Sequence, residues 1–316
     1  MRISFRLSCL WLAAAAIGGA IRAEPAPALR SLGSDAMEGA MKRWGSLYFA
    51  HHPGGTLAVA NGTMSVGLRS LAEGGADFCP SGRAAWPEET EQFVAVAGYQ
   101  PLRVTVARCT VDSQELPHPH AIFVSADNPL SRLTLTQVDA IFSSTRRRGG
   151  SEDIATWGQL GLTGEWARQP IHLYGVVRTK GPAHFFSERA LLDGKFKDSL
   201  VEVSGEELVL PKLATDRYGI AFTGLPFHFA GVKHLAIAES ASGHYSDGSA
   251  AEVIADRYPL ARVIYISVNR PPGRPLPSPV KEFLELALSP EGQHAAAVDG
   301  YLPLSAAQVA AELAHL

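Results

Sequence analysis

The chain has 316 residues, a formal net charge of -3 and a hydrophobic content of 46%. This composition is typical of a globular protein, and the slight negative charge does not indicate a surface for nucleic acid or another polyanion. We therefore predict no interaction with nucleic acid. Once an N-terminal targeting segment is removed, the chain is long for a single core and sufficient for two lobes of ordinary size.

The first 23 residues have the pattern of a cleavable signal peptide. Arg2 and Arg6 precede an apolar run that ends near Ile21-Arg22-Ala23. No later stretch has the roughly 18 consecutive apolar residues that a membrane-spanning helix needs. Cys9 lies near the start of the apolar run and does not close it, so we expect no lipid anchor. The sequence thus predicts export to the periplasm without a membrane span.

The N-terminal half alternates predicted strands and helices, as α/β domains do. Apolar residues predict a strand over residues 29–32 and then recur at helical spacing over residues 35–52. Pro53-Gly54-Gly55 would end that helix. A second strand is expected over residues 56–60, and a second helix over residues 66–73.

A helix start is indicated at Thr134, because its hydroxyl and Gln137 three residues later can satisfy two unpaired amides. Apolar patterning predicts the other regular elements. These are strands over residues 101–108, 121–125, 171–177 and 262–268, and helices after Pro182 and over residues 280–288.

Two predicted strand-to-helix turns are polar, contain a glycine and are cationic in sum. One is Gly33-Ser34-Asp35, and the other runs from Arg178 to Pro182. Each would direct unpaired amides and the positive end of a helix dipole toward one point. This arrangement can hold an anion without a metal.

Six strings, in order along nearly the whole chain after the leader, resemble the periplasmic phosphate-binding proteins of ABC importers. They cover residues 33–37, 125–142, 156–166, 218–224, 258–262 and 288–304. The resemblance implies an α/β type II periplasmic-binding-protein fold, with two lobes, each a mixed sheet flanked by helices, and two inter-lobe crossings. It places residues 24–118 and 264–316 in the first lobe and residues 119–263 in the second, and this discontinuity is consistent with hinge closure.

The resemblance also implies a function. We expect capture of inorganic phosphate, or a similar tetrahedral oxyanion, in the inter-lobe cleft and its delivery to an ABC transporter permease. No cofactor, metal or catalytic residue is expected, and the protein should be a monomer.

Matching the family's ligand loops to this chain gives the expected binding residues. They are Ser34, Ala36, Met37, Thr63, Ser65, Arg83, Arg178, Lys180 and Gly181. The chain departs from the family pattern at Ala36, Gly82, Lys180 and Pro182. Together, these departures remove hydroxyl groups from the ligand loops and add the ammonium group of Lys180. Since hydrogen bonds to charged groups are stronger than neutral ones, we expect anion binding to persist with altered discrimination between anions.

Structural explanations stay open for several of these residues. Arg83 has Glu88 and Glu89 as alternative partners at the surface. Arg178 and Lys180 could be ordinary surface charges, just as Ser34 and Asp35 could be helix caps. Thr63 and Ser65 fit either support of a turn or contact with the ligand.

The cysteines and histidines suggest no metal site. Cys79 and Cys109 could form a disulfide in an exported protein or remain two packed thiols. His51-His52 and His118-Pro119-His120 have no carboxylate or cysteine neighbour at metal-ligand spacing, so we predict no zinc site.

Two other functions remain alternatives on the same fold. A sensor or cell-surface interaction protein could retain the lobes with an altered anion specificity. A phosphate-ester hydrolase would need a metal or nucleophile, and the sequence contains no Gly-x-Ser-x-Gly elbow.

Overall fold

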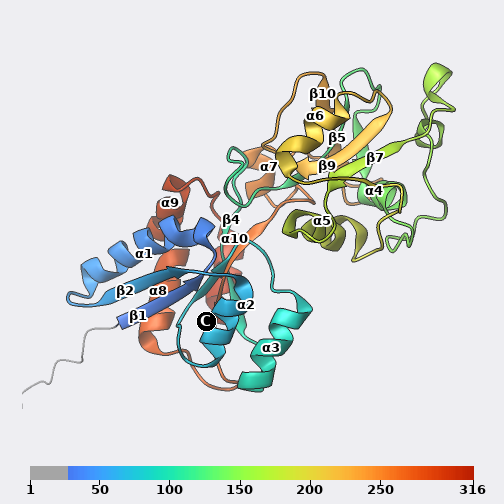
Figure 1. The fold of residues 1–316 in the computed structure, drawn as a ribbon. Helices are drawn as coiled ribbons and strands as arrows, with labels where there is room; N and C mark the ends of the chain where they lie inside the picture. The colour runs from blue at the N-terminus through green and yellow to red at the C-terminus, as the bar shows by residue number, and fades with distance from the viewer. Residues whose placement is uncertain (1–27) are drawn as a thin grey trace, which may run out of the picture.

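The computed structural model describes residues 28–316, so the predicted signal peptide over residues 1–23 and Cys9 lie outside the described residues. The chain forms two α/β lobes joined by two crossings (Figure 1). The N-terminal and C-terminal segments, blue to teal and orange to red, share one lobe, whereas the middle of the chain forms the other. None of the described helices is both long enough and apolar enough to cross a membrane.

The first lobe contains a parallel strand pair beside a three-stranded antiparallel sheet of order β3-β12-β4. Ser31 bridges to Phe78, so the strand pair and the sheet lie against each other. The strands are β1 (Ala28–Gly33), β2 (Thr56–Asn61), β3 (Cys79–Ser81), β4 (Leu102–Arg108) and β12 (Val263–Val268). As expected for an α/β lobe, β1, β2 and β3 each end in a loop that leads toward a helix.

Helices from both ends of the chain cover these strands. They are α1 (Glu38–His51), which follows the short helix η1 (Asp35–Met37), α2 (Met64–Ala72), α3 (Pro87–Ala97), α8 (Ser278–Leu288), α9 (Pro290–Val298) and α10 (Ala306–His315). Trp44 of α1 is fully buried, and its Nε1 donates to the Gly292 carbonyl at 2.8 Å. The rings of Phe78 and Phe283 lie 4.5 Å apart. The two ends of the chain therefore share one core.

The second lobe is built on a five-stranded mixed sheet of order β10-β5-β9-β7-β8. Its strands are β5 (His120–Ser125), β7 (His172–Val176), β8 (Val201–Val203), β9 (Gly219–Gly224) and β10 (Val232–His234), with β6 (Arg132–Thr134) and β11 (Ala236–Ala238) paired separately. Its helices are α4 (Leu135–Phe142), η2 (Trp157–Leu160), η3 (Gly164–Trp166), α5 (Gly181–Leu191), η4 (Glu206–Leu208), α6 (Val209–Leu213) and α7 (Ala250–Ile254). The predicted α/β class, with mixed sheets flanked by helices, is confirmed.

Aromatic rings fill the core between this sheet and its helices. Phe186 of α5 stacks on Phe222 of β9 with 4.0 Å between ring centroids, and Phe142 of α4 meets Phe222 edge-on at 5.7 Å. Such pairs add to the stabilisation from buried apolar area. The packing fixes α5, and with it the start of that helix, against the sheet.

The two crossings are hydrogen-bonded to each other. The Cys109 amide donates to the Arg262 carbonyl and the His120 amide to the Leu260 carbonyl, both at 3.1 Å. The Tyr258 hydroxyl donates to the His120 carbonyl at 2.7 Å. The chain therefore passes between the lobes as a paired ribbon.

The structure resolves the open question about the cysteines. Cys79 and Cys109 are both buried and both free. Cys79 packs with Met64 in the first lobe, whereas Cys109 belongs to the core cluster of the second. They are two packed thiols and not a disulfide.

Candidate anion-binding groove

A groove of about 360 Å³ lies between the two lobes. Its first-lobe lining comes from the loops that follow β1, β2 and β3, and its second-lobe lining comes from the start of α5. Four of the predicted ligand residues line it: Ser34, Thr63, Arg83 and Gly181. Its position outside the carboxyl ends of strands is where α/β proteins commonly bind ligands.

Close backbone contacts hold the three first-lobe loops together. The Ser34 amide donates to the Pro80 carbonyl at 2.9 Å, and the Gly62 amide donates to the Gly33 carbonyl at 2.7 Å. A Cβ atom on Gly33 would lie 2.3 Å from the Pro80 oxygen, so the approach requires glycine. The loops are thus positioned by each other as well as by their strands.

Two helices direct their N-terminal ends toward the groove. Thr63 caps α2, and its hydroxyl accepts from the Val66 amide at 3.3 Å. Gly181 and Pro182 begin α5, where proline suits the first turn because it has no amide to satisfy. First-turn amides have no intrahelical carbonyl partner and carry partial positive charge. The groove therefore receives hydrogen-bond donors from both lobes.

Arg83 lines the groove while paired with a buried carboxylate. Its Nη1 and Nη2 donate to the Glu89 oxygens at 2.7 and 2.8 Å, and its guanidinium lies 4.0 Å from the Trp86 ring centroid. Burial by itself raises the pKa of Glu89, but hydrogen bonds from Arg83 and the Trp86 amide leave that pKa below its ordinary value. The structure thus shows the alternative partner expected from the sequence, because Arg83 pairs with Glu89. This ion pair partly neutralises the charge of Arg83.

Arg262 is a second groove-lining arginine that the sequence analysis did not select. Its guanidinium lies 4.1 Å from the Phe185 ring centroid, and its Nε has no hydrogen-bond partner among the described residues. Burial lowers the pKa of Arg262, although an arginine stays charged at any physiological pH. The one sequence feature that could have indicated Arg262 is its position as a basic residue directly before the apolar strand β12, at the second crossing.

The two cations predicted from the second lobe, Arg178 and Lys180, contact other groups of that lobe and not the groove. The Arg178 amide donates to Glu202 at 2.8 Å, and its Nε lies 3.0 Å from the same carboxylate. Lys180 is exposed, and its Nζ donates to the Ser204 carbonyl at 2.9 Å. Neither residue lines the groove, because the chain segment around β8 supplies their partners.

Three other predicted residues also lie outside the lining. The Ser65 hydroxyl donates to Glu89 at 3.0 Å. The Ala36 amide donates to the Asp35 carboxylate at 2.8 Å, and its carbonyl accepts from Tyr301. Met37 is fully buried in the first-lobe core. These residues support the loops in this structure.

A larger cavity of about 400 Å³ also borders Arg83 and Arg262. Its lining holds the carboxylates Glu188, Asp256 and Glu312 together with four arginines, Arg83, Arg108, Arg189 and Arg262, and it lacks the helix starts. Net charge therefore does not separate the two cavities. The helix starts make the smaller groove the better candidate for binding an anion.

Comparison with known proteins identifies relatives of this chain among phosphate-binding proteins. No family model matches the chain. A phosphate-binding protein PstS from Pseudomonas aeruginosa is 36% identical over 278 residues, which is 88% of this chain and 83% of that protein. Protein SphX from Synechococcus elongatus is 24% identical over 58% of this chain and 53% of its own length.

Solved structures of similar fold include transport receptors. PstS from Borrelia burgdorferi has a TM-score of 0.62 at 15% identity, covering 88% of this chain and 99% of its own. An ABC-type phosphate transport receptor from Vibrio cholerae has a TM-score of 0.58 at 19% identity, covering 87% of this chain and 99% of its own. These proteins are named as binding proteins and receptors, not as enzymes. On the strength of the Pseudomonas relative, the chain belongs to the PstS family of phosphate-binding proteins.

Proposed function

We propose that this chain captures phosphate in the inter-lobe groove, in the periplasm, and delivers it to an ABC permease. The observation that carries the proposal is the convergence of Arg83, Arg262 and the first turns of α2 and α5 on one groove. Positive groups from both lobes would stabilise a small anion held between them. The family relationship favours phosphate among such anions.

We further propose that the lobes close around the anion. The boundaries would lie in the two crossings, with residues 24–118 and 264–316 in the first lobe and residues 119–263 in the second. The core clusters support the boundary near residue 263, because the second-lobe core ends at Leu260 and the first-lobe core resumes at Ile264. At the first crossing, Cys109 already packs in the second-lobe core, nine residues before the proposed boundary. Hinges of this kind absorb motion in a few crossing residues.

Asp35 supplies a basis for choosing phosphate over sulfate. Asp35 belongs to the groove lining, and an ionised carboxylate can only accept hydrogen bonds. Monohydrogen phosphate has a hydroxyl group that could donate a hydrogen bond to the Asp35 carboxylate. Sulfate has no such donor, so the negative charge of the carboxylate would repel it. The Asp35→Asn variant should therefore bind sulfate better relative to phosphate than the wild type does.

Calorimetric titration of the purified protein with phosphate, sulfate and methylphosphonate tests the function. The expected result is saturable heat with phosphate at one site per chain, and weaker or no heat with sulfate. No heat from any of the three anions would refute the proposal. Light scattering with and without phosphate tests the accompanying proposal of a monomer.

A further inference from the structure

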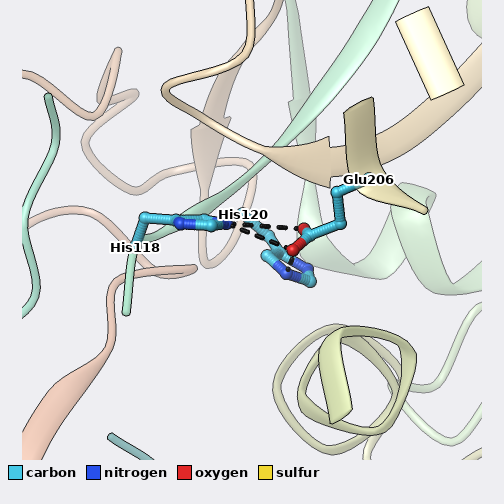
Figure 2. Close-up of side chains that lie close together, drawn as sticks. All are labelled: His118, His120 and Glu206. Atoms are coloured by element: carbon cyan, nitrogen blue, oxygen red, sulfur yellow. Dashed lines mark hydrogen bonds and ion pairs between the residues drawn. The ribbon is translucent and has the colours of Figure 1, made fainter. Parts of the chain in front are cut away.

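Two histidines and a glutamate meet beside the first crossing, in a cluster that the phosphate proposal does not use. His118 and His120 lie at the end of the crossing that leads into β5, and Glu206 begins η4 (Figure 2). One ligand atom from each residue lies within 4.8 Å of the other two. Glu206 follows His118 by 88 residues, which is why local spacing in the sequence predicted no zinc site.

The separations in this cluster are too long for ordinary histidine–carboxylate hydrogen bonds. His118 Nε2 lies 3.4 and 3.5 Å from the two Glu206 oxygens, and His120 Nε2 lies 3.4 Å from one of them. Elsewhere in the chain, the His172–Asp216 and His244–Glu252 pairs are at 2.7 Å, whereas the His52–Glu282 pair is at 3.7 Å. Charge-assisted hydrogen bonds are normally about 2.7–2.9 Å long.

The same separations fit a shared metal ion. Zinc binds imidazole nitrogen and carboxylate oxygen at about 2.0–2.2 Å in tetrahedral geometry, which places neighbouring ligand atoms about 3.3–3.5 Å apart. Both histidine-to-glutamate separations are already in this range. The two histidine nitrogens lie within 4.8 Å of each other, and only this separation would need to shorten when a metal binds.

The ring orientations also suit a metal. His118 Nδ1 lies 2.8 Å from the Leu116 carbonyl, so Nδ1 carries a proton, and Nε2, which faces Glu206, is the nitrogen available to a metal. Metal-binding histidines commonly use a backbone carbonyl in this way. His120 is completely buried, yet neither of its nitrogens has a partner with hydrogen-bond geometry among the described residues. A buried, unpartnered imidazole directed into the cluster indicates a missing ligand.

We propose that His118, His120 and Glu206 bind one divalent transition-metal ion, with Zn²⁺ the best match to two imidazoles and one carboxylate. Three protein ligands leave a fourth position for water. The Glu206 side chain retains 15% exposure, so the cluster borders solvent. The ion would tie the first crossing to η4 and so stabilise the path of the chain between the lobes.

Metal titration of untagged, chelator-treated protein in phosphate-free buffer tests the site. Zn²⁺ should bind with one high-affinity equivalent per chain, and Co²⁺ should give the visible absorption of a low-coordinate nitrogen and oxygen site. Zn²⁺ at roughly 100 times its Kd should raise Tm by about 5 °C. These measurements do not require phosphate binding, so the metal and phosphate proposals can fail separately.

Two conservative variants and a matched control locate the ion. Glu206→Gln and His118→Gln should each weaken Zn²⁺ binding at least about 100-fold, more than changes outside the ligand set usually do. His244→Gln, which alters an exposed histidine beside Glu252, should leave binding unchanged. Circular dichroism confirms that each variant is folded. A wild type without the Co²⁺ band, a Glu206→Gln variant with wild-type affinity, or loss of binding in His244→Gln would each overturn the proposal.

Discussion

Replacing Arg262 by glutamine should weaken phosphate binding far more than the same change at Arg178. Arg262 lines the groove, whereas Arg178 lies outside the lining and within 3.0 Å of Glu202. A hydrogen bond to a charged group contributes about 1.5–3 kcal/mol, so loss of the Arg262 contact should raise Kd about 10–150-fold. Arg178→Gln removes a charge that a carboxylate already compensates, and it should change Kd less than about 3-fold.

Calorimetric titration at fixed ionic strength measures both effects. Arg262→Lys serves as the charge-preserving variant and should recover part of the lost affinity, although a lysine cannot reproduce the planar guanidinium on Phe185. Urea unfolding separates binding from stability, because losing the contact with Phe185 should lower the free energy of unfolding by about 0.5–2 kcal/mol. If Arg178→Gln raised Kd as much as Arg262→Gln, the assignment of the groove would be wrong.

Three further predictions concern the supports of the groove. Gly33→Ala would place a methyl group 2.3 Å from the Pro80 carbonyl, so the free energy of unfolding should fall by about 1–3 kcal/mol and phosphate affinity should fall with it, as measured by urea unfolding and calorimetry. Glu89 has a pKa below the ordinary 4.5, so its ionised form stabilises the fold fully above about pH 5.5 and this contribution is lost in acid. Wild type should therefore lose its stability advantage over Glu89→Gln as the pH falls below about 4.5, and an advantage independent of pH would contradict the reasoning. Burial raises the pKa of Cys79 to about 12 and that of Cys109 to about 11. A thiol reagent at pH 8 should therefore label both cysteines only after the protein unfolds. Rapid labelling of the native protein would show instead that the thiols are accessible.

Local patterns in the sequence predicted many of the regular elements. The helix start expected at Thr134 is present, since the Gln137 amide donates to the Thr134 hydroxyl at 3.2 Å and the Gln137 side chain accepts from the Thr134 amide at 2.9 Å. The strand expected over residues 29–32 is β1, and the helix expected over residues 280–288 is α8, which begins two residues earlier. Caps, prolines and apolar periodicity act within one turn or strand, so they can be read without the fold.

The cations of the site could not be assigned in the same way. Arg178 and Arg262 both lie at a strand end near a glycine or proline, and the sequence alone favours the one in the matched loop. The difference arises because β8 brings Glu202 against Arg178, whereas no carboxylate pairs with Arg262 among the described residues. The same long-range pairing brings Glu206 to the histidines of the first crossing. An ion pair across strands depends on the sheet order, which local patterns do not contain.

Two features of the sequence therefore determine the groove: the glycines of its loops, and the pairing of its arginines with carboxylates that are distant along the chain. Its loops are specified by glycines that permit close backbone approach, at Gly33 against Pro80 and at Gly82, where a Cβ atom would lie 2.3 Å from Pro117. Its charge is specified by which arginine the fold leaves without a carboxylate. Substituting a loop glycine should therefore damage every anion contact together, because it moves several amides at once. Replacing Glu89 by glutamine should act mainly on charge, because it frees Arg83 from its ion pair while one side-chain oxygen remains to accept from the Trp86 amide.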